Sequence, residues 1–291
     1  MTSREKFGAY CSLPGLLIVA ILLSYPLGYN VYLSFMRYDN IQPVIFMGLA
    51  NYRQICGSSD FWLSWRVSLF YSLGTTALTL LISLLLAHSL YGIRKWQTFF
   101  RTMVILPWAV PGVISGMMFR WIMDTDLGVL NYLLAELGVI KQNIKFLVDY
   151  PMLSGILATT WSYIPFMTVL ILAGLESIPS ELYEVAEIDG ADSIDKFFHI
   201  SLALNKTQIL IAALIMWMFT FRTPDIFMSL TAGGPGKATY HAGIFLRDLI
   251  FKYMNFGYGS VVGVFLCLIV SVPASFILYK GVLKNNENST R

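Results

Sequence analysis

The sequence predicts an all-α integral membrane protein with six transmembrane helices, and three observations support this prediction. Apolar residues make up 56% of the 291 residues and charged residues only 13%, whereas a soluble domain carries about 25% charge. The apolar residues gather in six runs, each close to the ~20 residues that an α-helix needs to cross a bilayer. These runs are continuously apolar and lack the alternation of a barrel strand. We therefore expect residues 1–291 to form a single transmembrane domain.

The expected spans cover residues 10–35, 67–90, 102–123, 152–175, 208–230 and 258–280. The first run is too long for the core of a signal peptide and has no small-residue cleavage site, so we expect it to be a retained helix. Lys and Arg are slightly more frequent in the segments that share a side with the N-terminus, most clearly in 91–101 (Arg94, Lys95 and Arg101). This excess favours cytosolic N- and C-termini.

Composition and motifs exclude several classes of function. A net charge of +3 is too small and too scattered for a nucleic-acid-binding surface. The three cysteines lack CxxC spacing, so we expect neither a disulfide framework nor a metal site. The common hydrolase, metalloprotease and kinase motifs are absent from the sequence, so we expect no catalytic residues.

Proline interrupts five of the six expected spans. The positions are Pro26, Pro107, Pro111, Pro165, Pro224 and Pro273. A proline removes a backbone donor and disturbs the preceding turn. The prolines therefore indicate either ordinary helix kinks or unwound segments around a polar passage, as found in transporters.

Arg222 and Asp225 lie deep in the fifth span, where bare charges are costly. Three interpretations stay open: an ion pair that fixes the helix bend around Pro224, a polar lining of a permeation path, or side chains that reach the membrane interface. Two small-xxx-small pairs, Gly112/Gly116 and Gly259/Gly263, predict close helix contacts within this chain.

The segment 176–207 between the fourth and fifth spans holds seven of the seventeen acidic residues. It predicts two short helices outside the membrane. The first begins at Pro179-Ser180 and stops at Asp189-Gly190, and Asp192 caps the second. Both helices have apolar faces, which must dock either on the base of the same bundle or on another subunit.

This segment resembles the EAA loop in the membrane subunits of binding-protein-dependent ABC importers. The family pattern is E-A-A, three residues, G, nine residues and I-x-L-P. The chain has Glu184-Val185-Ala186, then Gly190, then Ile200-Ser201-Leu202-Ala203. It departs from the pattern at Val185, a mild change, and at Ala203, which replaces a proline that fixes the entry into the fifth span.

Two further segments extend the resemblance over nearly the whole chain. Residues 46–52 (FMGLANY) resemble the FxGLxNY segment of carbohydrate-importer permeases, and residues 230–235 (LTAGGP) resemble their LTxGGP segment. Both point to the half that is similar to the larger maltose-transporter membrane subunit.

The resemblance implies a multi-pass permease of a bacterial or archaeal cell (inner) membrane. Its expected partners are a second six-span permease subunit in a heterodimer, a dimer of cytosolic ATP-binding subunits and an extracytosolic solute-binding protein. ATP and Mg²⁺ are expected in the ATP-binding partner, and no cofactor is expected in this chain. The residues expected to couple to the ATPase are Glu184, Val185, Ala186, Asp189, Gly190 and Ala191.

The residues expected to line the substrate pathway are Tyr163, Thr220, Arg222, Thr223 and Asp225. Aromatic rings and hydroxyls suit a sugar or polyol, whereas Arg222 would suit an acidic or phosphorylated solute. The alternative functions are an ion-coupled secondary transporter or channel, which the charges at 222 and 225 permit, and a membrane-embedded enzyme, for which the spans offer no catalytic group.

Overall fold

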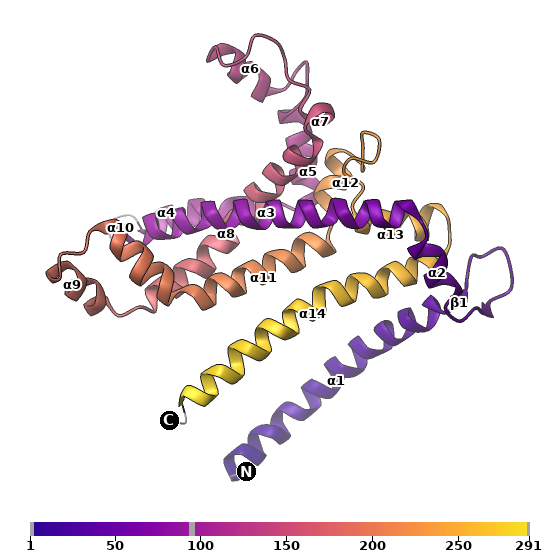
Figure 1. The fold of residues 1–291 in the computed structure, drawn as a ribbon, viewed down its shortest axis with the longest axis horizontal. Helices are drawn as coiled ribbons and strands as arrows, with labels where there is room; N and C mark the ends of the chain where they lie inside the picture. The colour runs from indigo at the N-terminus through magenta and orange to yellow at the C-terminus, as the bar shows by residue number, and fades with distance from the viewer. Residues whose placement is uncertain (1–2, 93–96, 290–291) are drawn as a thin grey trace. The chain divides into compact units, whose positions relative to one another are not determined.

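The computed structural model describes residues 3–92 and 97–289, and most of them are helical (Figure 1). The chain divides into two compact units. The first comprises Met1–Phe61 and Phe245–Leu268, and the second comprises Trp62–Ile244 and Ile269–Arg291. The residues that the sequence singles out for solute passage and for coupling all lie in the second unit.

The first unit begins with a long helix and a small strand pair. Its elements are α1 (Ser3–Ser34), β1 (Met36–Arg37), β2 (Ile45–Phe46), α2 (Ala50–Cys56), the π-helical turn η3 (Asp248–Lys252) and the first part of α14 (Phe256–Ser289). The antiparallel pairing of β1 with β2 corrects the all-α prediction in this one place.

The FxGLxNY-like segment has a packing role in this unit. The side-chain amide of Asn51, which is 4% exposed, donates to the carbonyl oxygens of Ser34 (2.9 Å) and Met36 (2.8 Å). The Tyr52 hydroxyl lies 2.7 Å from the Ser34 hydroxyl. These bonds tie α2 to the end of α1, because buried backbone carbonyls need partners.

A β-carbon on Gly263 would lie 3.2 Å from the amide of Asn30 in α1, so this glycine does serve close packing within the chain.

The second unit is a helical bundle with a loop of short helices at one end. Its elements are α3 (Ser59–Gly92), α4 (Gln97–Ile105), the 3₁₀ turn η1 (Leu106–Ala109), α5 (Gly112–Ile122), α6 (Val129–Glu136), α7 (Phe146–Asp149), α8 (Pro151–Glu176), α9 (Ser180–Ile188), α10 (Ser193–Lys196), the π-helical turn η2 (Phe197–Leu202), α11 (Lys206–Arg222), α12 (Asp225–Leu230) and α13 (Ala242–Arg247), which begins here.

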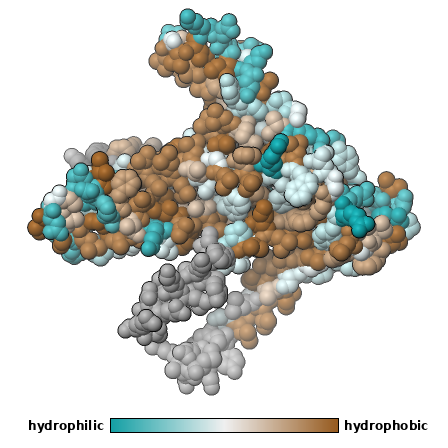
Figure 2. All heavy atoms as spheres, in the orientation of Figure 1, coloured by the Kyte–Doolittle hydropathy of each residue, from teal (hydrophilic) through white to brown (hydrophobic). Residues whose placement is uncertain are grey.

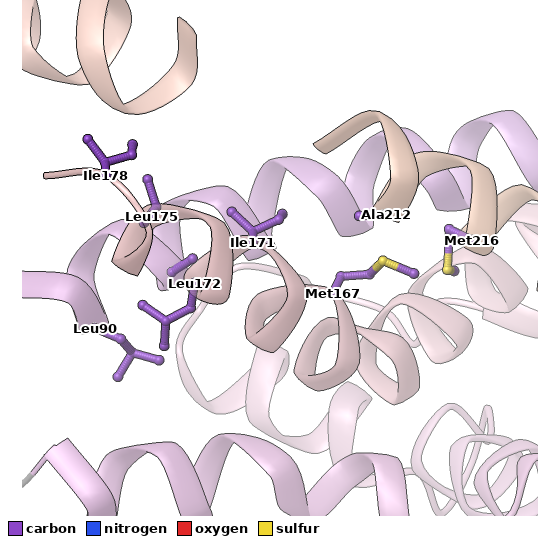
Figure 3. Packing of buried hydrophobic residues seen from close by; sticks show 9 residues of the cluster. Leu90, Met167, Ile171, Leu172, Leu175, Ile178, Ala212 and Met216 are labelled. Atoms are coloured by element: carbon purple, nitrogen blue, oxygen red, sulfur yellow. The ribbon is translucent and has the colours of Figure 1, made fainter. Parts of the chain in front are cut away.

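Helix α8 lies in the core of this unit between α3 and α11. Figure 3 shows the apolar cluster where the three helices meet. It consists of Ala87, Leu90, Met167, Ile171, Leu172, Leu175, Ile178, Ala212 and Met216. In Figure 2 hydrophobic residues dominate the surface along the long helices, and hydrophilic residues gather at the end that carries α9 and α10.

A polar seam joins α3 to α8. Small hydroxyl residues recur every three or four positions along α3, and all are fully buried: Ser64, Ser68, Ser72, Thr75, Thr79 and Ser83. Ser83 donates to the carbonyl of Ile164 (3.2 Å), and Thr79 bonds Thr160 (3.4 Å). Lipid gives helices no hydrophobic reason to associate, so small side chains and interhelical hydrogen bonds hold such pairs together.

Four single helices in the described part of the chain are long and apolar enough to cross a membrane: Cys11–Ser34, Ser59–Gly92, Pro151–Glu176 and Phe256–Pro273. They correspond to the expected spans 10–35, 67–90, 152–175 and 258–280. Two bent helix pairs raise the number of candidate spans to six.

The expected span 102–123 is a broken helix. Phe99–Ala109 and Gly112–Ile122 meet at an angle of 92°. Val110 between them is extended (φ −82°, ψ 122°) because the residue before a proline avoids the helical conformation. Pro111 then begins the turn into α5.

The expected span 208–230 is also broken. Helix α11 ends at Arg222, Thr223 is extended (φ −114°, ψ 108°) before Pro224, and α12 starts at Asp225. By contrast, Pro165 lies inside α8 and Pro273 inside α14. Pro111 and Pro224 therefore mark breaks, whereas Pro165 and Pro273 lie inside continuous helices.

The entry into α11 bends without the proline that the family pattern places at 203. Ser193–Leu202 and Lys206–Arg222 meet at 69°. Asn205 at this corner is buried and donates to the carbonyl of Ile171 in α8 (2.9 Å). A β-carbon on Gly174 would lie 1.9 Å from the side-chain amide oxygen (Oδ1) of Asn205, so the corner depends on a glycine opposite it.

Candidate functional site

A small cavity of about 80 Å³ lies where five helices of the second unit meet. Its lining comes from α3, α5, α8, α11 and α12 and from the break between the last two. The lining residues are Tyr71, Gly112, Thr159, Tyr163, Phe219, Thr220, Thr223, Asp225 and Ile226. Four of the five residues predicted for the substrate pathway are therefore brought together here.

The lining is rich in hydroxyls and aromatic rings. The Tyr71 hydroxyl lies 2.7 Å from that of Thr159, and the Tyr163 ring stacks on Phe219 with centroids 5.6 Å apart. Thr220 donates to the carbonyl of Met216 (2.9 Å) and Thr223 to that of Phe219 (2.8 Å). Donation to the helix backbone leaves each threonine oxygen with lone pairs that can accept from a ligand.

Arg222 and Asp225 are both exposed. Asp225 is the charged side chain of the cavity lining, and Arg222 lies outside it. The two residues, both within the described chain, form no ion pair within 4 Å. The break at Thr223-Pro224 ends the regular spacing that would place residues 222 and 225 on one face. The structure thus does not form the bend-fixing ion pair.

A wider hollow of about 300 Å³ adjoins this cavity and shares Gly112, Tyr163 and Ile226 with it. Its other lining residues are Trp108, Val110, Pro111 and Ser162, so it forms at the 92° break between α4 and α5. The half-exposed Trp108 ring stacks on Phe166, with centroids 5.4 Å apart. The broken helix therefore gives the wider hollow an aromatic wall.

The second candidate site is the helical loop formed by α9, the turn at residues 189–192 and α10. Gly190 has φ +85°, a left-handed conformation that glycine adopts without steric cost. The Asp192 carboxylate accepts from the backbone N–H groups of Ile194 and Asp195, both at 2.8 Å. The sequence-based prediction of two short helices with these caps is confirmed.

An ion pair closes the loop between its two helices. Lys196 Nζ donates to Glu187 Oε1 at 2.5 Å. This hydrogen bond and the positive charge of Lys196 lower the pKa of the Glu187 carboxyl below its ordinary 4.5.

One side of the loop packs on its own bundle and the other is exposed. The Tyr183 hydroxyl lies 3.0 Å from that of Ser201, and its ring is 5.8 Å from the Tyr91 ring at the end of α3. On the other side, large apolar side chains are exposed: Leu182, Val185, Ile188, Ile194 and Phe198. The first alternative, docking on the same bundle, therefore accounts for one side of the loop, and the bundle leaves the apolar side chains of the other side exposed.

The predicted coupling residues surround the turn. Glu184, Asp189 and Gly190 are exposed, and Ala186 and Ala191 are half-buried. Val185 is 55% exposed on the apolar side of α9.

A family model described as "Binding-protein-dependent transport system inner membrane component" matches residues 79–285, more than two thirds of the chain. The chain belongs to this family. It is therefore a non-catalytic permease component of an ABC transporter and a multi-pass protein of the inner membrane.

Curated relatives agree with this assignment. The chain is 32% identical over 271 residues to the trehalose/maltose transport system permease protein MalF of Thermococcus litoralis, covering 92% of this chain and 90% of the relative. It is 31% identical over 258 residues to the sulfoquinovosyl glycerol transport system permease protein SmoG of Agrobacterium fabrum, covering 86% and 82%. The predicted resemblance to a maltose-transporter membrane subunit is confirmed.

A solved structure shows the same fold. A chain in the crystal structure of a bacterial ABC transporter involved in the import of the acidic polysaccharide alginate superposes on the permease with a TM-score of 0.76 and 20% identity, covering 95% of each chain. The fold is therefore that of an ABC importer permease.

Sequence reasoning missed several lining residues of the cavity, among them Tyr71, Thr159 and Phe219. The signal for Tyr71 was present in the hydroxyl residues of α3, because Ser68 and Thr75 lie three and four positions away and mark the same face. Within the described residues of the permease, no group of three or more His, Cys, Asp or Glu side chains could hold a metal ion.

Proposed function

We propose that the permease forms half of the translocation pathway for a carbohydrate-type solute, a sugar or related polyol. The other half is a second six-span permease subunit in a heterodimer. The loop 181–200 couples this pathway to a dimer of cytosolic ATP-binding subunits. One observation carries the proposal. Tyr163, Thr220, Thr223 and Asp225 gather around one cavity at the break between α11 and α12.

The chemistry of the lining favours a neutral, hydroxyl-rich solute. Threonine and tyrosine hydroxyls can both donate and accept, and a carboxylate accepts strongly from sugar hydroxyls. The one charge in the lining is negative, and Arg222 lies outside it. Relatives are named for transport of trehalose and maltose or of sulfoquinovosyl glycerol, so carbohydrates as a class fit both the site and the family.

The size of the cavity supports a pathway made by two subunits. A volume of 80 Å³ holds two or three waters at roughly 30 Å³ each, which is too little for a sugar ring. A hollow of about 300 Å³ lies beside it at the break between α4 and α5. Passage of a sugar therefore needs movement at the 92° break, contribution from a second permease subunit, or both.

The exposed side of the loop supports docking to an ATP-binding subunit. Ile188 at the end of α9 is 85% exposed, and unpartnered apolar side chains in such a cluster are typical of interaction sites. Glu181, Glu184 and Asp189 make no ion pair in the part of the chain that the structure describes. A partner with an apolar cleft and basic residues at its rim complements this side of the loop.

ATP and Mg²⁺ belong to that partner in this proposal. Closure of the ATP-binding dimer pulls the loops of the two permease subunits together and shifts the pathway between inward-open and outward-open states. A solute-binding protein delivers the solute on the extracytosolic side, and both termini of the permease lie in the cytosol.

Uptake by proteoliposomes that contain the assembled transporter tests the proposal. We expect accumulation of a radiolabelled sugar that requires ATP on the loop side and the binding protein on the other side. Uptake that follows a Na⁺ or H⁺ gradient without ATP would support the secondary-transporter alternative instead. Vesicles assembled without this permease are the control.

A further inference from the structure

An ion pair joins the root of the coupling loop to a different helix. Arg101 in α4 donates through Nη2 to Oε1 of Glu176, the last residue of α8 before the loop begins. The two residues are 75 positions apart in sequence. Their side chains are 33% and 42% exposed, so the pair lies at the edge of the bundle.

The same bent element that carries Arg101 reaches the cavity at its other end. Val104 in α4 packs on the apolar cluster of α3, α8 and α11, and Trp108 in η1 stacks on Phe166 of α8. Beyond the break, Gly112 at the start of α5 lines the cavity. A β-carbon on Gly112 would lie 3.4 Å from the Asp225 β-carbon, so α5 packs directly on α12.

We propose that the Arg101–Glu176 ion pair transmits movement of the coupling loop to α4 and, through the break at Val110-Pro111, to the cavity. This inference rests on the proposed function. Glu176 is where the loop joins α8, so displacement of the loop first moves this residue. The apolar contacts of Val104 and Trp108 have no fixed direction and permit sliding along α8. A charge-assisted hydrogen bond fixes the register of α4 against the loop.

The role of the pair is positional, because a partly exposed ion pair contributes little to stability. Loss of the pair should therefore leave the permease folded and assembled while the work of ATP hydrolysis reaches the cavity less efficiently. The decisive quantity is the number of solute molecules taken up per ATP hydrolysed, which a purely structural contact would not change in the assembled fraction.

Charge reversal in the complete transporter tests this role. We expect Arg101→Glu and Glu176→Arg each to lower uptake per ATP about fivefold or more, the low end of typical coupling between sites. The double variant, with the charges exchanged, should recover most of the ratio. Glu176→Gln keeps an acceptor oxygen and should cost less than Glu176→Arg. Arg120→Glu on α5 makes the same charge change away from the loop, and we expect the wild-type ratio.

An unchanged ratio in Arg101→Glu, or a double variant no better than the single ones, would overturn the inference. Gly190→Asp separates this failure from failure of the proposed function. If Gly190→Asp stops uptake while Arg101→Glu does not, the loop couples but not through this pair. If neither variant has an effect, coupling through the loop is itself wrong.

Discussion

Gly116 of α5 lies so close to Ser229 of α12 that a β-carbon on the glycine would come within 2.0 Å of the serine hydroxyl oxygen. The same atom would lie 2.7 Å from the carbonyl oxygen of Ile226. Real β-carbons do not approach other atoms so closely, so only glycine permits this crossing. The crossing holds α12, and with it Asp225, against the helix that follows the 92° break.

We predict that Gly116→Ala destabilises the permease by about 1–3 kcal/mol, the usual cost of overpacking. The carbonyl of Ile226 cannot move aside as a flexible side chain can. Thermal unfolding in detergent measures the effect. Gly28→Ala in α1 is the matched control, because a β-carbon there meets nothing within 4 Å. Equal unfolding temperatures for the two variants would contradict the close crossing.

The cavity lining predicts different outcomes for the two charges near the break. Asp225→Asn should weaken solute uptake about tenfold or more, since a hydrogen bond to a charged group contributes roughly 1.5–3 kcal/mol. Arg222→Gln should leave the range of transported solutes unchanged, because Arg222 lies outside the lining. Competition assays with neutral and anionic sugars measure both. If only Arg222→Gln changed the range of transported solutes, Arg222 and not Asp225 would line the pathway, and this prediction would be contradicted.

A substitution in the turn of the coupling loop should stop solute uptake without unfolding the permease. Gly190→Asp places a side chain on a left-handed residue and adds a charge to the turn of the loop that we propose to dock on the ATP-binding subunit. We expect uptake to stop and association with the ATP-binding subunit to weaken, while the permease still inserts.

Gly138→Asp provides the control for this variant. Gly138 also has a positive φ (+69°) and open space around it, but it lies in the segment after α6. Both substitutions carry a similar backbone cost of about 1–2 kcal/mol. Similar uptake in the two variants would mean that strain, and not position in the loop, decides the result.

The Glu187–Lys196 ion pair predicts a pH dependence of the loop. The folded state lowers the pKa of Glu187, so the unfolded loop binds more protons at low pH. The contribution of the pair to stability is therefore complete above the ordinary pKa of 4.5 and is lost as pH falls through the lower folded value. Hydrogen exchange in the loop, corrected for intrinsic rates, should show this loss in the wild type and not in Glu187→Gln. Identical pH profiles in the two proteins would contradict it.

The long helices and the capped loop could be predicted from sequence because their signals are local. Apolar runs define α1, α3, α8 and α14, and the caps at Gly190 and Asp192 depend on neighbouring residues only. Local sequence signals could not show which prolines break a helix and which only lie within one. Pro165 stays within α8, which lies between α3 and α11, whereas Pro111 and Pro224 each follow an extended residue.

The cavity was predictable only in part, because Tyr71, Thr159 and Phe219 of its lining were not among the predicted pathway residues. Asp225 stands out because a carboxylate is rare in an apolar run. Phe219 looks like an ordinary member of an apolar helix, and only the packing of α8 and α11 shows that it faces the cavity. The same holds for Arg101 and Glu176, which the sequence separates and the fold joins.

Cross-linking from position 188 tests the central claim that this loop receives mechanical work from an ATP-binding subunit. A photoreactive amino acid replaces Ile188, the most exposed apolar residue of the loop, in the assembled transporter in native membranes. We predict cross-links to the ATP-binding subunit whose yield changes between nucleotide-free and ATP-bound states. Cross-links to the extracytosolic solute-binding protein would place the loop on the opposite side of the membrane and contradict the account.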